Sequence, residues 1–253
     1  MTTPMMLEGR TALITGGGRG IGAATARLFA KHGAKVAVNY HQNAKAAIAL
    51  AKSIDDEGGT AVPIQADVRD ANSVAAMIKA VESLLGPIDT LVSNASISFP
   101  MAPFTEYPWE AFEAKLVGEI KSAFNCCRAV VPGMIARKKG CIIAVSSGLS
   151  RRPGPGFCAH TTAKSGLDGL MKSLALELGP MGIRVNVVAP GLTLTDAVAH
   201  MPEQMRQMSA KSTPLQRNAE AADIAGAILL LASEEARFLT GTYLPVSGGS
   251  LML

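Results

Sequence analysis

Short apolar runs rich in β-branched residues alternate along this chain with longer helical stretches, and this alternation constrains the fold more than any other feature. The runs are apolar at consecutive positions, which is typical of parallel strands buried on both faces. Strands are predicted at residues 11–15, 35–39, 61–65, 90–94, 140–145 and 184–188, and helices at 21–32, 45–56, 73–85 and 161–178. Repeated strand-helix-strand units need right-handed crossovers and cover a parallel sheet on both sides. The sequence therefore predicts an α/β Rossmann fold with a doubly wound parallel sheet of about seven strands.

Length and composition favour a single domain over residues 1–253. The chain has 253 residues, which exceeds the common domain size, but a doubly wound sheet can absorb that length in one unit. With 48% hydrophobic residues and 25 glycines, the composition predicts helices packed closely on a sheet and argues against disorder. The richest Pro/Gly segment, residues 152–156, is too short to separate domains, and we interpret it as a loop over a site.

The charge distribution excludes several classes of partner. The 24 basic and 20 acidic residues are spread along the chain, and no basic run resembles a nucleic-acid footprint. The formal charge of +4 suits an anionic small molecule. The first ten residues lack the apolar run of a signal peptide, and no apolar stretch approaches the ~18 residues of a membrane span. We therefore expect a cytoplasmic protein that binds neither nucleic acid nor a membrane.

The cysteines and most histidines carry no recognisable site. Because the cysteines lack metal-ligand spacing, we interpret them as reduced core thiols and predict no metal site; they are Cys126, Cys127, Cys141 and Cys158. Three histidines fall outside any constellation and are interpreted as surface residues; they are His32, His41 and His200.

A glycine-rich loop follows the first predicted strand and opens the first predicted helix. Its residues are Gly16, Gly18, Arg19, Gly20, Ile21 and Gly22. Glycine lets the backbone turn tightly and approach a pyrophosphate, whose charge then faces the helix N-terminus. A plain strand-to-helix turn is the alternative interpretation. The strand, the loop and the helix together favour a dinucleotide site.

The end of the second predicted strand bears on the choice of dinucleotide. NAD-selective proteins place an acidic residue there to bind the ribose 2′-hydroxyl, whereas this chain has Asn39 followed by Tyr40 and His41. No carboxylate would repel a 2′-phosphate at this point, and Arg19 could pair with one. NADP(H) is therefore favoured, NAD(H) remains possible, and Arg19 can also be interpreted as an exposed loop charge.

Several spaced motifs resemble the short-chain dehydrogenase/reductase family, in a layout similar to its 3-oxoacyl-carrier-protein reductases. Besides the glycine loop, the resemblance rests on paired residues after the third to sixth strands and near the C-terminus: Asp67 and Val68, Asn94 and Ala95, Ser146 and Ser147, Pro190 and Gly191, and Gly248 and Gly249. Ser96 stands where the family usually has glycine. The cofactor-binding residues that the loop and the resemblance imply are Gly16, Gly18, Arg19, Gly20, Ile21, Gly22, Asn39, Asp67, Val68, Asn94, Lys164, Pro190, Gly191, Thr193 and Thr195.

The resemblance also implies a catalytic site, with one replacement at its centre. Family members use a serine, a Tyr-x-x-x-Lys helix and an upstream asparagine. Here the matching segment begins with His160 in the tyrosine position and ends with Lys164, and Ser147 lies 13 residues earlier (160 − 147 = 13). Counting back from Phe124 places the asparagine position on Glu119. The predicted catalytic residues are therefore Ser147, His160, Lys164 and Glu119.

These replacements suggest a division of roles. Glu119 could accept a hydrogen bond or charge from Lys164 and leave His160 to titrate near neutrality, as an imidazolium acid. Other interpretations stay open: His160 could bind substrate without transferring a proton, or be a polar residue in a lapsed site. Ser147 could cap a loop, and Lys164 could be a solvated helix charge. Glu119 could instead pair with one of two nearby lysines, Lys115 or Lys121.

Three functions are compatible with these residues. The first is an NADP(H)-dependent oxidoreductase acting on a small or carrier-linked carbonyl; the second is non-redox acid/base chemistry such as dehydration, isomerisation or cyclisation; the third is a non-catalytic nucleotide-binding module. The loops at residues 97–107, 150–159 and 192–215 should line the substrate pocket, with 192–215 as a mobile lid. The resemblance further implies a homotetramer or homodimer formed through residues 111–132 and 161–178.

Overall fold

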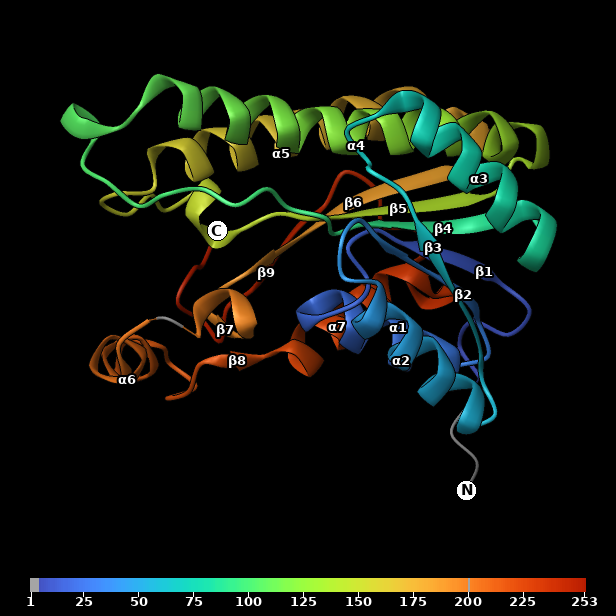
Figure 1. The fold of residues 1–253 in the computed structure, drawn as a ribbon, viewed down its shortest axis with the longest axis horizontal. Coiled ribbons are helices and arrows are strands. Elements are labelled where there is room, and N and C mark those ends of the chain that lie inside the picture. The colour runs from blue at the N-terminus through green and yellow to red at the C-terminus, as the bar shows by residue number, and fades with distance from the viewer. Residues whose placement is uncertain (1–4, 200) are drawn as a thin grey trace.

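A twisted parallel sheet with helices on both faces forms the centre of the molecule (Figure 1). The computed structural model describes residues 5–199 and 201–253. Within these residues, seven strands pair in the order β3-β2-β1-β4-β5-β6-β9, and every pairing is parallel. Their bounds are β1 Thr11–Ile14, β2 Lys35–Tyr40, β3 Thr60–Gln65, β4 Ile88–Ser93, β5 Gly140–Val145, β6 Ile183–Pro190 and β9 Tyr243–Val246. The predicted doubly wound Rossmann sheet is confirmed.

Two layers of helices cover the sheet. Helices α3, α4 and α5 lie on one face, and α1, α2 and α7 lie on the other (Figure 1). The helix bounds are α1 Gly20–Lys31, α2 Ala44–Asp56, α3 Ala71–Leu85, α4 Trp109–Arg137, α5 Cys158–Leu178, α6 Glu203–Ser212 and α7 Ala221–Ala232. The sequence patterns had located α1, α2, α3 and α5, but they did not assign α6, α7 or β9. Within the described part of the chain, no helix combines the length and the low polarity that crossing a bilayer requires.

The pleat of the strands explains why they are apolar at consecutive positions. In β5, Cys141, Ile143 and Val145 join the core beneath α1, α2 and α7, whereas Ile142 and Ala144 join the core beneath α3, α4 and α5. Successive side chains of a strand point to opposite faces, so a strand covered on both sides must be apolar throughout.

The strand order reverses at β1, and this reversal locates the crevice. The chain adds β2 and β3 on one side of β1 and then adds β4, β5 and β6 on the other. The connections after β1 and β4 therefore leave the sheet in opposite directions and open a crevice at the carboxyl ends of these two strands, where ligands of doubly wound folds bind. The glycine loop and Asn94 follow these two strands.

The predicted lid at residues 192–215 and the histidines predicted to lie on the surface can be compared with the structure. The stretch at residues 192–215 begins with β7 (Thr193–Leu194), which pairs in parallel with β8 (Ala219–Glu220) beyond the stretch. It also holds α6, none of whose described residues is buried. Its motion as a lid stays a prediction. The interpretation of His32 as a surface residue is wrong, because its side chain is buried where α1 ends against residues 7–9. His41 is exposed as expected, and His200 lies outside the described residues.

Candidate functional site

The glycine loop between β1 and α1 has positions that only glycine suits, by its backbone angles or by the lack of space for a side chain. Gly16 and Gly20 have φ angles of +60° and +54°, in the left-handed region that favours glycine. A Cβ atom on Gly22 would lie 2.6 Å from the Gly16 carbonyl oxygen and 2.7 Å from Nδ2 of Asn94. Arg19, the exposed N-cap residue of α1, forms no side-chain hydrogen bond to the first turn among the described residues. The first-turn amides are thus left for an anion.

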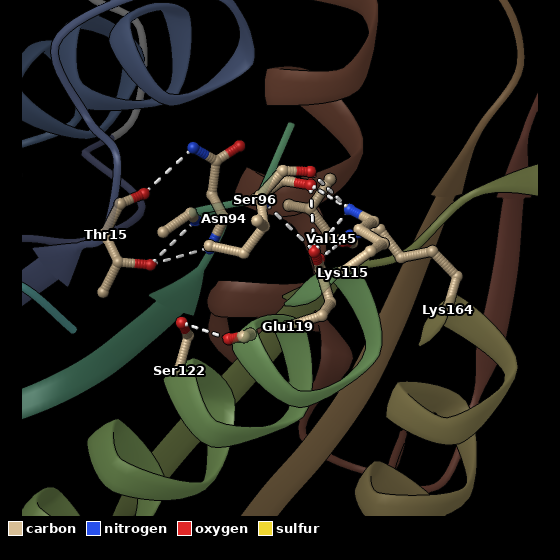
Figure 2. A network of polar contacts seen from close by, with 11 residues as sticks. Thr15, Asn94, Ser96, Lys115, Glu119, Ser122, Val145 and Lys164 are labelled. Carbon is tan, nitrogen blue, oxygen red and sulfur yellow. Dashed lines mark hydrogen bonds and ion pairs between the residues drawn. The ribbon is translucent and has the colours of Figure 1, made fainter. Parts of the chain in front are cut away.

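Thr15 and Asn94 tie the glycine loop to the end of β4 (Figure 2). The Thr15 hydroxyl accepts hydrogen bonds from the amides of Asn94 and Ala95, at 2.9 and 3.0 Å. The Asn94 side chain donates to the carbonyl oxygens of Thr15 and Gly16, at 2.9 and 3.1 Å. Asn94 is half-buried in this arrangement, and its side-chain hydrogen bonds stabilise the conformation of the glycine loop.

Asn39 also supports the glycine loop, and its assignment to the cofactor site stays a prediction. Its side chain is 2% exposed. Its Oδ1 accepts from the Gly16 amide at 3.2 Å, while its Nδ2 donates to the Ala66 carbonyl at 3.2 Å and the Ile64 carbonyl at 3.4 Å. All of these contacts point into the fold, because the pleat of β2 turns Asn39 toward the loop. The residues that follow it, Tyr40 and His41, are the more exposed ones.

Asp67, after β3, carries a cationic partner that sequence reasoning missed. The Arg69 side chain forms two hydrogen bonds with its carboxylate, from Nε at 2.9 Å and from Nη2 at 2.8 Å, and the Arg69 amide donates a third at 2.9 Å. His41 lies nearby, with its Nε2 3.7 Å from Oδ2 of Asp67. The hydrogen bonds from Arg69 lower the pKa of Asp67 to about 2. The neighbouring Val68 is buried, and its carbonyl accepts from Asn125.

The segment after β6 approaches the glycine loop from the other side. A Cβ atom on Gly20 would lie 3.4 Å from Cγ2 of Thr195, so these two residues are neighbours. Pro190 ends β6, and the buried Thr193 donates its hydroxyl to the Gly191 carbonyl at 3.0 Å. The structure therefore brings the predicted residues after β1, β4 and β6 together around one crevice.

Glu119 and Lys164 form a buried ion pair between α4 and α5 (Figure 2). The Lys164 ammonium lies 2.6 Å from Oε1 of Glu119 and donates to the Val145 carbonyl at 2.7 Å. Lys164 is therefore not a solvated helix charge. The register counted back from Phe124 led to a carboxylate that contacts Lys164, as expected for that position.

Lys115 joins the same carboxylate from one turn earlier on α4. It is fully buried, and its Nζ lies 2.6 Å from Oε2 of Glu119. It also donates to the Ser96 hydroxyl at 2.9 Å and to the Ile97 carbonyl at 2.8 Å. The two interpretations of Glu119, as partner of Lys164 and as partner of Lys115, hold at once. Two ammonium groups therefore share one buried carboxylate.

Burial and mutual attraction set the pKa values in this cluster. Burial alone would raise the pKa of Glu119, but the charges of Lys164 and Lys115 outweigh it and lower this pKa to about 2. Burial lowers the pKa of Lys115 to about 8, against the opposing effect of Glu119. At neutral pH the cluster holds two cations and one anion, so one positive charge is in excess.

His160 lies beside this excess charge and packs against aromatic rings. Its imidazole stacks on Phe99, with ring centroids 4.7 Å apart and planes 20° apart. Its Nδ1 is buried and has no hydrogen-bond partner among the described residues. Burial, followed by the charges of Lys164 and Lys115, lowers the pKa of His160 to about 3. The expectation that His160 titrates near neutrality is therefore wrong: the ring is an uncharged imidazole at neutral pH.

Ser147 begins the short 3-10 turn at Gly148–Ser150, directly after β5. Its hydroxyl accepts from the Leu149 amide at 3.2 Å, so the interpretation of Ser147 as a cap describes one of its contacts. Its carbonyl accepts from the Tyr243 hydroxyl at 3.0 Å. The Ser150 hydroxyl lies 3.0 Å from that of Tyr243 and donates to the buried Asp168 at 2.7 Å. The sequence motifs did not include Tyr243, which β9 brings to this turn.

Comparisons with known proteins identify the family of this arrangement. The family model described as Enoyl-(Acyl carrier protein) reductase matches residues 16–250. The 3-oxoacyl-(acyl-carrier-protein) reductase FabG of Staphylococcus aureus is 36% identical over 245 residues, which is 96% of this chain and 98% of that protein. This chain belongs to the short-chain dehydrogenase/reductase family. It is accordingly an oxidoreductase by family.

Solved structures of short-chain dehydrogenases have the same fold over their full length. A short chain dehydrogenase from Burkholderia cenocepacia J2315, solved in complex with NADP, superimposes with a TM-score of 0.87 and 32% identity, covering 97% of this chain and 99% of that one. A dehydrogenase/reductase from Sinorhizobium meliloti 1021 gives a TM-score of 0.90 and 36% identity, covering 100% and 99%.

The cysteines of this short-chain dehydrogenase lead to a first prediction. Burial raises the pKa of Cys126 to about 12 and also raises the pKa values of Cys127 and Cys141, whereas Cys158 is only partly buried. Because the thiolate is the reactive form, we expect one rapidly reacting thiol in the native protein and four after denaturation. Titration with a thiol-specific disulfide reagent measures both numbers, and Cys158→Ser should remove the native reaction. Rapid reaction at two or more native thiols would contradict this burial.

Proposed function

We propose that this protein is an NADP(H)-dependent reductase that transfers hydride between the nicotinamide and a carbonyl or alcohol substrate. The observation that carries the proposal is the fixed position of Lys164 at the carboxyl end of β5. Its ammonium contacts Glu119 and the Val145 carbonyl. Val145 lies two residues before Ser147, and Lys164 itself lies one helical turn after His160. Lys164 thus reaches the end of β5, and Ser147 and His160 are its neighbours along the strand-turn-helix segment, which follows the sheet edge where a dinucleotide would bind.

Two independent observations support binding of the cofactor at this crevice. The turn at Gly22 has no space for a Cβ atom, and the first turn of α1 has no side-chain cap among the described residues, which leaves amides there that could bind an anion. The residues that would hold the cofactor are Gly16, Gly18, Arg19, Gly20, Ile21, Gly22, Asp67, Val68, Asn94, Lys164, Pro190, Gly191, Thr193 and Thr195, with Asn39 bracing the loop. When bound, the nicotinamide supplies the hydride. The similar Burkholderia cenocepacia dehydrogenase, which was solved in complex with NADP, supports this assignment.

The choice of NADP(H) over NAD(H) rests on charge at the edge near β2 and β3. Asn39 is uncharged and buried, and the carboxylate of Asp67 is neutralised by Arg69. Arg19 is exposed in the glycine loop, and His41 lies beside Asp67. This edge would therefore attract a 2′-phosphate.

The substrate carbonyl would bind between Ser147 and His160. The Ser147 hydroxyl can donate a hydrogen bond to the carbonyl oxygen, and an uncharged imidazole can do the same through its N–H. His160 thus occupies the place of the family tyrosine as a neutral hydrogen-bond donor, not as an imidazolium acid. Hydride transfer would turn the carbonyl into an alkoxide, and the proton that completes the alcohol would come from solvent water. A carrier-linked carbonyl is the proposed substrate class, since the similar protein from Staphylococcus aureus bears the name of a 3-oxoacyl-(acyl-carrier-protein) reductase.

The oligomer implied by the family resemblance is part of the proposal. Apolar side chains remain exposed on α4 and α5, including Val117, Phe124 and Leu176, at 51%, 47% and 80% of their accessible areas. Exposed apolar residues on two adjacent helices suit a helix-on-helix interface between copies of the chain. We propose a homodimer or homotetramer through this face.

The functional test follows NADPH absorbance with a panel of β-ketoacyl thioesters and aromatic ketones. We expect turnover with the wild type and a loss of about 10²-fold or more in kcat/KM for His160→Ala, because a hydrogen bond made in the transition state is lost. Ser173→Ala, at an exposed position further along α5, serves as the matched control and should keep wild-type rates.

Two results would overturn this proposal. The redox assignment fails if wild type and His160→Ala are equally inactive on every substrate while NADPH still binds. Turnover of substrate without any change in the cofactor would instead support dehydration, isomerisation or cyclisation in the same pocket.

A further inference from the structure

Lys115 is the surplus cation of the buried cluster, and the proposed function leaves it without a role. Glu119 and Lys164 already form a balanced pair at 2.6 Å. Lys115 adds a second ammonium that is fully buried and has one carboxylate to share. Burying a charge without full compensation costs stability. A group retained at such a cost, next to a candidate active site, points to a function there.

The Phe99 ring lies between Lys115 and His160 and contacts both side chains. The Lys115 Nζ lies over the Phe99 ring, 5.1 Å from the centroid, which is within the range of a cation–π contact. The same ring stacks on the His160 imidazole, with centroids 4.7 Å apart. Phe99 therefore contacts both the surplus charge and the candidate catalytic ring, and its stacking restricts the plane of that ring.

We propose that Lys115 is a positioning residue for His160: it holds the Phe99 ring on which the imidazole stacks, and its ammonium disfavours a further positive charge beside it. This inference rests on the proposed function for its catalytic meaning. An uncharged imidazole accepts or donates a hydrogen bond to a neutral carbonyl or hydroxyl oxygen. An imidazolium would instead attract carboxylates, so Lys115 would also bias the site toward neutral oxygen groups.

The charges around His160 add to the effect of its burial, which is the largest cause that lowers its pKa. The groups that act on it are Lys164 on its own helix, and Lys115 and Glu119 on α4. Both ammonium groups oppose protonation of the ring, and only the carboxylate favours it. Removing Lys115 leaves one cation and one anion beside His160, so the ring becomes easier to protonate. Lys164 cannot replace Lys115 in this comparison, because it belongs to the proposed catalytic machinery.

The test compares Lys115→Met with Lys121→Met, a matched control at an exposed lysine on the same helix. NMR titration of histidine side chains in ¹⁵N-labelled protein reports the charge of His160, whose signal is assigned with His160→Gln. We expect the wild-type and Lys121→Met rings to stay uncharged down to pH 5 and below. In Lys115→Met the His160 pKa should rise by one unit or more, which is a change of about tenfold in proton affinity.

A second variant and a second measurement keep the test decisive. Phe99→Leu removes the shared ring, leaves every charge in place, and should broaden the His160 signal by loosening the ring, even if Lys115→Met does not fold. In the pH profile of kcat/KM, Lys115→Met should gain an acidic limb that the wild type lacks. An unchanged His160 pKa in folded Lys115→Met, or an unaltered signal in Phe99→Leu, would overturn the role of Lys115. Because NMR needs no turnover, this outcome is distinguishable from failure of the proposed function.

Discussion

Replacement of Glu119 by alanine is expected to lower the free energy of unfolding by about 3–5 kcal/mol and to abolish NADPH-dependent turnover. The carboxylate is the shared anion of Lys115 and Lys164, each at 2.6 Å, and it also accepts from the Ser96 hydroxyl and the Ile97 amide. Its removal leaves two buried ammonium groups that repel each other. Urea unfolding followed by circular dichroism measures the loss.

An exposed carboxylate on the same helix provides the control for this prediction. Glu113 lies on the solvent side of α4, and Glu113→Ala should change stability by no more than about 0.5 kcal/mol. A loss below about 1 kcal/mol for Glu119→Ala would mean that the cluster contributes little to folding. In that case the excess of buried positive charge that motivates the role of Lys115 would also be in doubt.

The contribution of the Glu119 carboxylate to stability should also depend on pH. The folded-state pKa of Glu119 is about 2, below its ordinary value of 4.5. Its contribution is therefore fully present above pH 4.5 and is lost as the pH falls toward 2, because the unfolded chain binds the proton more readily. Glu119→Gln should be less stable than wild type at neutral pH, and this difference should shrink progressively below pH 4.5.

The sequence predicted most of the framework because the framework depends on local patterns. Consecutive apolar residues such as those of β5 identified buried strands, and the glycine spacing identified the loop before α1. The positions of Ser147, His160 and Lys164 on one strand-turn-helix segment followed from their spacing, and their joint action as a site stays a prediction. Even the link from Glu119 to Lys164 could be anticipated from a count of residues.

The remaining features depend on which side chains the tertiary fold buries. A lysine on a helix is ordinarily solvated, whereas the ammonium of Lys115 lies against the loop at Ser96 and Ile97, which is distant in sequence. Asn39 faces the glycine loop because of the pleat, not because of its position at a strand end. Tyr243 reaches Ser147 across 96 residues of sequence, so no local motif could contain it. The charge of His160 likewise depends on burial and on neighbours from another helix.

Substitution of Gly22 by alanine is expected to weaken NADPH binding by about 5- to 150-fold, because overpacking of a tight site costs about 1–3 kcal/mol. The added Cβ atom would lie 2.6 Å from the Gly16 oxygen and 2.9 Å from Cα of Gly17, and backbone atoms cannot rotate away as a side chain does. The loop must then open, which displaces the amides that would bind the pyrophosphate. Fluorescence titration with NADPH measures the affinity.

Gly226→Ala is the matched control for Gly22→Ala, since both glycines lie in helices and differ in the space around them. A Cβ atom on Gly226, in the middle of α7, would meet no described heavy atom within 4 Å. Alanine there should raise stability by about 0.5–1 kcal/mol through its better helix propensity and should leave NADPH affinity unchanged. The two variants therefore separate a general effect of alanine in a helix from closure of the cradle. Wild-type NADPH affinity in Gly22→Ala would show that the pyrophosphate does not bind at this turn, and the cofactor assignment would fail with it.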